Sequence, residues 1–285
     1  MKVSIIVPVY NEQKSVRTTI ELLKRVMQET DYTYEIIAVN DGSHDSSGKI
    51  LDSIKGIKVL RHNRNKGYSS SLKTGIKEST GDVIAITDAD GTYPVEEIPA
   101  LLKFMGNFDM VVGARIGKRV AIPFSRKPAK WILGKIANYI AGRRIPDINS
   151  GLRVFKKDLA LEFWKILPER FSFTITITLA SITSGYDIKF VPINYYVRQG
   201  KSTIHPIKDF LSFGKIITRM MLFFRPLKIF IPLSIFIFIL GLLILAIGFL
   251  YFNQIMDATF LLFTMFSVQF FALGLIAEMI ANKVS

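Results

Sequence analysis

The segment Val3-Ser-Ile-Ile-Val-Pro-Val-Tyr-Asn-Glu12 decides the fold class of this chain of 285 residues. Its run of branched apolar residues predicts a buried strand over Val3–Val9. The segment Val16–Met27 then repeats apolar residues every three or four positions, which predicts an amphipathic helix. A buried strand followed directly by a helix is the first unit of an α/β fold.

The same alternation of apolar runs and helix-compatible segments continues along the chain. Further strands are expected at Ile36–Asn40, Ile57–Leu60, Val83–Thr87 and Met110–Gly113. This pattern predicts a mostly parallel, doubly wound, Rossmann-like sheet. Ligands of such sheets bind beyond the carboxyl ends of the strands.

Four carboxylates follow the predicted strands at those ends: Glu12, Asp41, Asp88 and Asp90. Taken alone, Asp41 fits a turn and helix cap in Asn40-Asp-Gly-Ser43. Together, four carboxylates at one edge need a cation or hydrogen-bond donors. Asp88 and Asp90 are two residues apart at a strand end, so both point to one side. With the phosphates of a substrate, this pair is typical of a Mg²⁺ or Mn²⁺ site.

Residues 229–285 are almost free of charged side chains, and this composition predicts a membrane hairpin. Ile229–Phe252 and Ala258–Ala277 hold no charged residue, and each is long enough to cross a bilayer. Asn253–Asp257 allows only a tight turn between them. A pair of buried core helices is the alternative, but core helices are seldom apolar on every face. The basic residues before the first span and Lys283 after the second predict that both ends lie in the cytoplasm.

The rest of the chain is strongly basic. Residues 1–228 contain 36 basic and 21 acidic residues, a net charge of +15, within a chain whose overall charge is +14. A hydrophobic content of 49% excludes a disordered chain, and the absence of cysteine excludes disulfides and cysteine-ligated metals. The three histidines, His44, His62 and His205, have no partner by spacing, which favours structural or exposed roles.

A basic segment follows the last predicted strand. Residues 110–146 contain nine Lys or Arg and no acidic residue. Within it, a helical spacing predicts a helix with an apolar and a basic face, formed by Trp131, Ile132, Lys135, Ile136, Tyr139 and Ile140. Nucleic acid could neutralise this charge, but anionic headgroups and a lipid phosphate are the better partners beside a membrane hairpin. Arg115 is expected at the same sheet edge as the acidic residues.

Four motifs in order resemble those of family 2 glycosyltransferases with the GT-A fold. They are Pro8-Val-Tyr-Asn-Glu12, Asn40-Asp-Gly-Ser43, Asp88-Ala-Asp90 and Asp147-Ile-Asn-Ser-Gly-Leu-Arg153. The resemblance covers about residues 1–228. It is closest to the dolichyl- or polyprenyl-phosphate sugar synthases, such as dolichol-phosphate mannose synthases, whose membrane-anchored members carry a C-terminal hairpin.

The resemblance implies inverting transfer of a hexose or N-acetylhexosamine from a nucleotide-diphosphate sugar to dolichyl or polyprenyl phosphate. It implies that Pro8, Tyr10, Glu12 and Asp41 contact the nucleoside, and that Asp88 and Asp90 hold the metal and diphosphate. It also implies that Arg115, Arg126 and Lys130 meet the acceptor phosphate, whereas Arg198, supported by Lys201, meets the donor diphosphate. Asp90, Arg115 and Arg198 are the residues expected to act in catalysis.

The sequence departs from the mannosyl members of this family at two places. Asn40 stands where an aspartate is usual, and Gly91-Thr92 replaces a Leu-Gln pair after the metal motif. The Gly-Thr-Tyr version looks more like members that use UDP-glucose or UDP-N-acetylglucosamine, so a UDP-sugar is favoured over GDP-mannose. Arg198-Gln-Gly-Lys-Ser202 is not a phosphate-binding P-loop, because Tyr195 stands where a P-loop needs glycine.

The expected organisation is a GT-A catalytic domain over 1–200, a juxtamembrane segment over 201–228 and a transmembrane hairpin over 229–285. Ile207–Met221 reads as an amphipathic helix along the membrane surface. A homo-oligomer is possible, and no nucleic acid partner is expected. The competing hypothesis is a membrane-tethered, non-catalytic nucleotide-sugar-binding partner of a glycan assembly complex, which the intact Asp88 and Asp90 pair disfavours.

Overall fold

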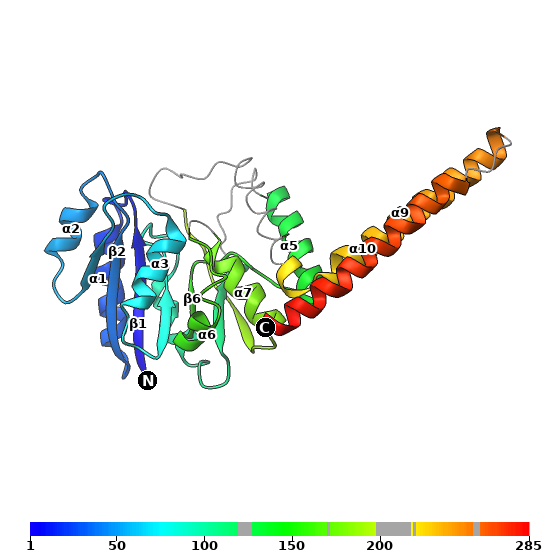
Figure 1. Ribbon diagram of the computed structural model, residues 1–285. Coiled ribbons are helices and arrows are strands. Elements are labelled where there is room, and N and C mark those ends of the chain that lie inside the picture. Colours follow the sequence, from blue (N-terminus) through cyan, green and yellow to red (C-terminus); the bar gives the residue numbers. More distant parts are fainter. Residues whose placement is uncertain (119–126, 170–171, 198–217, 219–220, 253–256, 285) are drawn as a thin grey trace. The chain divides into compact units, whose positions relative to one another are not determined.

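The computed structural model describes residues 1–118, 127–169, 172–197, 218, 221–252 and 257–284 (Figure 1). The chain forms two compact units, residues 1–213 and 214–285. The boundaries expected at 200 and 228 stay predictions. Most of the expected amphipathic helix Ile207–Met221 lies outside the described residues.

The first unit is built on one sheet of seven strands. The strands are β1 (Lys2–Val9), β2 (Thr33–Asn40), β3 (Lys58–Arg61), β4 (Val83–Ile86), β5 (Met110–Ala114), β6 (Arg153–Lys156) and β7 (Ile188–Pro192). Their order across the sheet is β3-β2-β1-β4-β6-β5-β7. The five strands expected from the sequence are all present, with ends shifted by up to three residues.

Strand β6 runs against the other six strands of this sheet. It pairs antiparallel with β4 and with β5, whereas the remaining pairs are parallel. The mostly parallel sheet is therefore confirmed. Because β6 is reversed, its amino end lies at the edge where its neighbours have their carboxyl ends. The loop that leads into β6 consequently joins the candidate site.

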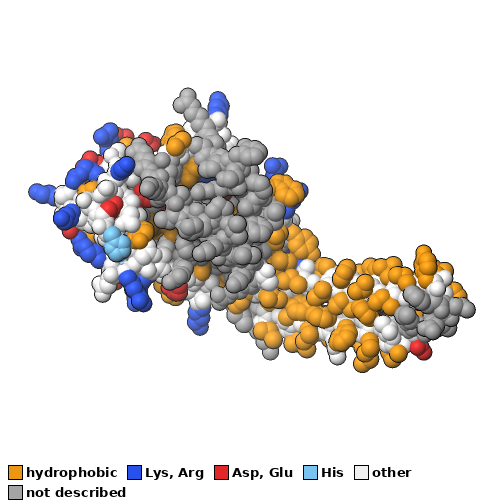
Figure 2. Space-filling model, turned by 90° about the horizontal axis from the view of Figure 1, so that it is seen from above, with side chains coloured by type: hydrophobic (Ala, Val, Ile, Leu, Met, Phe, Trp, Pro, Cys, Tyr) orange, Lys and Arg blue, Asp and Glu red, His pale blue; other side chains and the backbone are white. Residues whose placement is uncertain are grey.

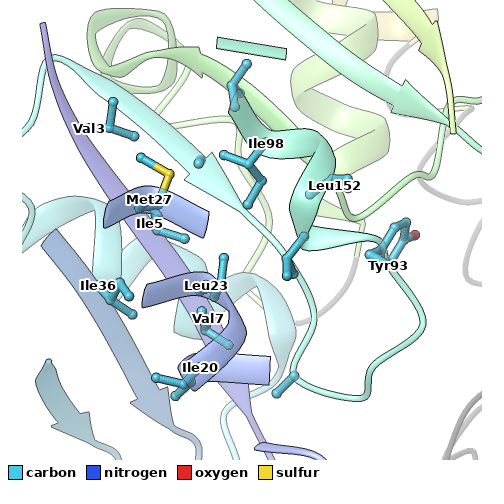
Figure 3. Close-up of a cluster of buried hydrophobic side chains, with 14 of the residues drawn as sticks. Val3, Ile5, Val7, Ile20, Leu23, Met27, Ile36, Tyr93, Ile98 and Leu152 are labelled. Atoms are coloured by element: carbon cyan, nitrogen blue, oxygen red, sulfur yellow. The ribbon is translucent and has the colours of Figure 1, made fainter. Parts of the chain in front are cut away.

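Helices pack on both faces of this sheet. They are α1 (Val16–Gln28), α2 (Ser47–Ser53), α3 (Tyr68–Lys77), α4 (Ile98–Leu102), α6 (Lys157–Glu162) and α7 (Phe173–Thr183), with a 3₁₀ turn, η1, at Val95–Glu97. Helix α5 (Lys127–Ala141) packs against α7. The apolar side of α1 and alternate residues of β1 form one core, in which Ile5, Ile20 and Leu23 are fully buried (Figure 3). On the other face, Ile6 of β1 packs against Gly75 of α3. Burial on both faces explains why β1 reads as a continuous apolar run.

The second unit is a helical hairpin of α9 (Leu227–Phe252) and α10 (Asp257–Val284). Both helices are long and apolar enough to cross a membrane, and only 17% and 6% of their most apolar windows are buried. Figure 2 shows hydrophobic side chains along the hairpin surface. Helices of a protein core would be mostly buried, so this exposure fits a lipid environment. Small residues bring the helices close, because Gly241 packs against Phe263 and Gly274 against Phe230.

Candidate functional site

The loops that follow β1 and β2 are joined by hydrogen bonds at the carboxyl edge of the sheet. The backbone amide of Asn11 donates to Ser43 Oγ over 3.1 Å, and the amide of His44 donates back to Asn11 Oδ1 over 2.9 Å. Asn11 has a φ of 55°, which turns the chain sharply after β1. Tyr10 lies in this first loop with its ring edge-on to His44, the centroids 6.4 Å apart. The nucleoside-binding residues expected here thus share one rigid wall.

Glu12 and Asp41 are both buried, with 8% and 3% of their surface exposed. Asp41 accepts hydrogen bonds from the backbone amides of Lys66 and Gly67 at 2.9 and 2.8 Å. Its Oδ1 also lies 2.6 Å from His62 Nδ1. Asp41 therefore fixes the loop between β3 and α3.

The expectation that His62 has no partner is wrong. The imidazole is buried, and its second nitrogen lies 2.9 Å from Thr74 Oγ1. The spacing of Asp41 and His62 along the chain does not reveal this pair. Each residue directly follows a different strand, β2 or β3, and these strands are neighbours in the sheet. Parallel pairing of these strands carries their following residues to the same edge.

Asp88 and Asp90 lie just beyond β4, as the sequence predicts. The Asp90 carboxylate accepts hydrogen bonds from the backbone amide and the hydroxyl of Thr92, at 3.1 and 2.6 Å. Gly91, which lies between Asp90 and Thr92, has a φ of 73°, and a β-carbon there would meet no atom of the described residues within 4 Å. The turn after β4 is therefore open on the side of Gly91.

The Asp88 carboxylate is enclosed by a residue of its own loop and by residues from two other segments. A β-carbon on Gly151 would lie 3.0 Å from both carboxylate oxygens and 3.1 Å from Tyr93 Cε2. The Tyr93 hydroxyl accepts a hydrogen bond from the Gly151 amide over 2.7 Å. The Tyr68 hydroxyl is buried beside Asp88, and burial followed by the Asp88 charge raises the pKa of Tyr68 well above its usual value. Gly151 is thus the residue whose small size leaves room for Asp88.

Arg115 forms a buried ion pair with Asp147. Its Nε and Nη2 donate to the two carboxylate oxygens over 2.7 and 2.9 Å, and its backbone amide donates over 3.0 Å. Only 13% of the Arg115 side chain and 1% of the Asp147 side chain are exposed. Burial alone would lower the pKa of Arg115, but Tyr93 and Asp147 outweigh it and raise this pKa. The guanidinium also stacks over Tyr195 at 5.2 Å.

Arg153, the first residue of β6, is completely buried below this loop. Its Nε donates to the Ser150 carbonyl over 3.1 Å, while Nη1 reaches the Thr174 carbonyl and Thr178 Oγ1 of α7 at 3.1 and 2.7 Å. Burial lowers the pKa of Arg153 to about 10, although the nearby tyrosines and Asp147 favour its charge. Arg153 therefore ties the site loop to a buried helix.

The predicted acceptor-phosphate and diphosphate residues are only partly described. Arg126, Arg198 and Lys201 lie outside the described residues, and Lys130 belongs to α5 without a described side chain. The helix expected around Trp131 is confirmed as α5. Of the apolar face expected from the sequence, Ile140 is buried, whereas Trp131 and Tyr139 are exposed.

The arrangement at the end of β4 fits a divalent cation held partly by a substrate. Among the described residues, no three His, Cys, Asp or Glu side chains form a closed metal site. Two carboxylates beside the open turn at Gly91 leave coordination positions for phosphate oxygens and water. Mg²⁺ is usually held in this way, by one or two carboxylates and substrate phosphates.

The residues missed from the sequence are Asp147, Gly151 and Tyr68. Asp147 and Gly151 lie in the motif Asp147–Arg153, which was recognised without a role for either residue. The signal available was an acidic residue and a glycine just before a short apolar run. This signal becomes informative only once β6 is known to be antiparallel. The reversed direction of β6 brings the loop before it to Arg115 and Asp88.

Comparison with protein families matches both units of the chain. The model "Glycosyl transferase family 2" matches residues 4–164, which is more than half of the chain. The model "GtrB C-terminal hairpin" matches residues 225–282, which contain α9 and all but the last two residues of α10. The family resemblance read from the four motifs is thereby confirmed.

Several curated proteins are similar in sequence. A prophage bactoprenol glucosyl transferase homolog of Escherichia coli K12 is 31% identical over 60% of this chain and 56% of its own length. An undecaprenyl-phosphate 4-deoxy-4-formamido-L-arabinose transferase of Proteus mirabilis is 32% identical over 55% and 50%. An undecaprenyl-phosphate mannosyltransferase of Micrococcus luteus is 29% identical over 70% and 85%. The match thus spans little more than half the length of the first two relatives.

Solved structures share the fold at low sequence identity. Glucosyl-3-phosphoglycerate synthase of Mycobacterium tuberculosis, crystallised with Mn²⁺, UDP and phosphoglyceric acid, has a TM-score of 0.61 and 14% identity, over 78% of this chain and 77% of that one. TarS of S. aureus with UDP-GlcNAc has a TM-score of 0.57 and 20% identity, over 78% and 67%. The GT-A architecture expected from the sequence is therefore confirmed.

Proposed function

The chain belongs to glycosyl transferase family 2, and from this premise we propose that it transfers a sugar from a nucleotide-diphosphate sugar to a polyprenyl phosphate. The proposal rests on one observation, that two features occur together in this chain. An Asp88 and Asp90 pair stands at the carboxyl edge of a GT-A sheet, and an apolar hairpin follows that domain. The named relatives with bactoprenol or undecaprenyl phosphate in their descriptions support the same acceptor class.

The donor is assigned to the wall formed by the loops after β1, β2 and β4. Tyr10, Glu12 and Asp41 would line the nucleoside side, and Pro8 at the end of β1 would support it. Asp88 and Asp90 would hold a Mg²⁺ or Mn²⁺ ion together with the diphosphate, and the bound cation would offset the charge that develops on the leaving group. Thr92 keeps one oxygen of Asp90 occupied and so fixes the orientation of that carboxylate. A UDP-sugar is the favoured donor because Gly91-Thr92-Tyr93 after the Asp88-Ala-Asp90 motif resembles family members that use UDP-sugars.

The acceptor requires cations and no protein base. A phosphate monoester with a second pKa near 6 is largely dianionic at neutral pH, as for a phosphorylated side chain. Its oxygen can attack the sugar directly, with inversion, whereas a hydroxyl acceptor would need a general base. Because Asp147 neutralises Arg115, we expect Arg126 and Lys130 to supply most of the charge that attracts the acceptor. Arg115 would then orient it, and Arg198 with Lys201 would bind the diphosphate.

The hairpin would anchor the enzyme where its acceptor resides. The basic residues next to the spans, Arg225 and Lys228 before the first and Lys283 after the second, would keep the catalytic domain on the cytoplasmic side. The net charge of +15 in residues 1–228 would favour its contact with anionic headgroups. This location also gives access to nucleotide sugars. An acceptor phosphate at the membrane surface would then meet a donor from solution.

The deciding experiment uses purified full-length protein in lipid vesicles that contain undecaprenyl phosphate. A panel of radiolabelled nucleotide sugars is then added, one at a time. Label should enter the lipid phase with one donor, in the presence of Mg²⁺ or Mn²⁺, and EDTA should stop transfer. Asp90→Asn should abolish transfer while circular dichroism shows an unchanged fold. The product should have the opposite anomeric configuration to the donor.

The competing hypothesis of a non-catalytic nucleotide-sugar-binding partner makes a different forecast. It predicts nucleotide binding with no labelled lipid from any donor, including in native membranes. Transfer that persists fully in Asp90→Asn or in EDTA would refute the assigned metal site. A product with retained configuration would refute direct attack by the phosphate.

A further inference from the structure

The carboxylate of Asp41 is held by three hydrogen bonds beside the proposed place of the donor nucleoside. Its Oδ2 accepts the backbone amide of Gly67 over 2.8 Å. Its Oδ1 accepts the backbone amide of Lys66 over 2.9 Å and lies 2.6 Å from His62 Nδ1. An ionised carboxylate only accepts hydrogen bonds, so Nδ1 of His62 carries a proton and donates it to Oδ1. No other donor in the described part of the chain reaches the Asp41 side chain.

These contacts leave little of the Asp41 carboxylate for a ligand. An ionised carboxylate has about four acceptor positions, two on each oxygen. Lys66 and His62 fill both positions on Oδ1, whereas Gly67 fills one of the two positions on Oδ2. Asp41 can therefore accept one further hydrogen bond, through Oδ2.

His62 is fixed in the position from which it occupies Oδ1. Its Nε2 lies 2.9 Å from Thr74 Oγ1 in α3, and only 4% of the imidazole is exposed. The loops that follow β2 and β3 are also in direct contact, because a β-carbon on Gly42 would lie 2.6 Å from the backbone of Arg64. Neither His62 nor Asp41 can turn away without disturbing both loops. The occupied Oδ1 is therefore a built-in property of this site.

Nucleobases differ in how many donors they would present to such a carboxylate. Uracil has one N–H, at N3, between two carbonyl groups. Guanine has two adjacent donors, N1–H and the N2 amino group, which together match the two oxygens of a free carboxylate. Only 4% of the Asp41 side chain is exposed, so the second donor of guanine would be left unpaired and cut off from water. An unpaired buried donor weakens binding by about five- to a hundredfold.

We propose that His62 is a positioning residue that occupies Oδ1 of Asp41 and thereby makes the donor site select uracil over guanine. This role rests on the proposed placement of the nucleoside beside Asp41. His62 need not touch the base, because it acts through the number of acceptor positions that it leaves on the carboxylate. Base selection is thus assigned to a residue that directly follows β3, far in the sequence from the turn at Gly91 and Thr92.

The test compares the binding of UDP and GDP to the purified full-length chain in detergent micelles with Mn²⁺, by isothermal titration calorimetry. Both nucleotides carry the same ribose and diphosphate, so the ratio of their dissociation constants reports on the base. The unmodified protein should bind UDP at least fivefold more tightly than GDP. His62→Phe keeps a ring without a donor, and the preference should fall at least threefold. His62→Asn, whose Nδ2 can donate in place of Nδ1, should keep most of the preference.

Ser4→Ala is the matched control for the loss of a buried hydrogen bond. Ser4 is completely buried and donates to Glu35 over 2.6 Å near the amino end of β1, at the edge of the sheet opposite the site. Ser4→Ala should lower the midpoint of thermal unfolding and leave the ratio of UDP to GDP binding unchanged.

Three results would overturn the role of His62 and leave the proposed sugar transfer standing. They are tighter binding of GDP than of UDP by the unmodified protein, an unchanged ratio in His62→Phe, and equal losses of preference in His62→Phe and His62→Asn. Binding of neither nucleotide would overturn this role together with the proposed donor site. Nucleotide binding requires no acceptor, so a failure of sugar transfer alone would count against the proposed acceptor and not against His62.

Discussion

The Asp88 carboxylate is confined by residues from distant parts of the chain. Its position after β4 follows from the apolar run Val83–Ile86, because a buried strand must end where polar residues begin. Its neighbours Tyr68 and Gly151 could not be predicted in this way. They come from α3 and from the loop before β6, and only the strand order brings them to Asp88.

The tight contact at Gly151 gives a prediction about the metal site. Gly151→Ala would place a methyl group 3.0 Å from both Asp88 oxygens, so the carboxylate must move by several tenths of an ångström. We expect at least a tenfold loss of sugar transfer, because misplaced catalytic groups cost about this much or more. The Mn²⁺ concentration needed for half-maximal nucleotide binding should rise as well.

Gly106→Ala is the matched control for Gly151→Ala. A β-carbon at Gly106 would meet nothing within 4 Å, and the residue lies between α4 and β5. Transfer and Mn²⁺ dependence in Gly106→Ala should equal those of the unmodified protein. If Gly151→Ala also behaved like the unmodified protein, Asp88 would not be the constrained metal ligand assigned here.

The ion pair of Arg115 and Asp147 leads to a second prediction at this scale. Asp147→Asn keeps the shape of the side chain but leaves the buried Arg115 charge without its counter-ion. Removing one partner of a buried pair typically costs about 3–5 kcal/mol, so the midpoint of thermal unfolding should fall clearly. Replacing both, as in Arg115→Met with Asp147→Leu, should restore much of the stability and none of the activity. An unchanged midpoint in Asp147→Asn would show that the pair is not held as described.

At the level of elements, the sequence was informative wherever one face of an element meets the core. The helical period of Val16–Met27 was correct to one residue, because the buried side chains of α1 recur at that period. Neither α7 nor β6 is predicted from the sequence. Every residue from Phe173 to Ile182 is buried, so α7 shows no amphipathic period, and β6 has only four residues.

The link between β6 and α7 predicts that Arg153 cannot be replaced by lysine. Lysine keeps the charge but lacks the planar fork that serves the Ser150 carbonyl, the Thr174 carbonyl and Thr178 together. Buried groups left without hydrogen bonds should lower the free energy of unfolding by about 2–4 kcal/mol in Arg153→Lys. Denaturant unfolding followed by tryptophan fluorescence would measure this change.

Lys156→Met at the other end of β6 is the control for Arg153→Lys. Lys156 pairs with Asp109 over 2.8 Å, but its side chain is 51% exposed. Exposed pairs contribute about 0–1 kcal/mol, so Lys156→Met should change stability little. Equal losses in the two variants would mean that Arg153 contributes no more than a surface residue.

For the whole molecule, charge and hydropathy carry more information than any motif. Residues 1–228 hold a net charge of +15, and after them only Asp257, Glu278 and Lys283 are charged. This division predicted a globular unit followed by a membrane hairpin, and the two compact units agree with it. The orientation that we propose rests on the flanks of the hairpin, because basic residues tend to remain on the cytoplasmic side of a membrane.

The hairpin orientation can be tested with single cysteines, because the natural chain has none. Arg225 and Lys228 lie at one end of α9 and Lys283 at the neighbouring end of α10, whereas Asp257 begins α10 at the turn. Moving the basic ends across the bilayer opposes the positive-inside bias, so the turn should face outward. In intact cells, a membrane-impermeant maleimide should therefore label Asp257→Cys and spare Lys55→Cys, an exposed position in the first unit. Both variants should react once the cells are permeabilised, which shows that each thiol is accessible. Labelling of Lys55→Cys in intact cells, with Asp257→Cys protected, would place the catalytic domain outside, away from cytoplasmic nucleotide sugars.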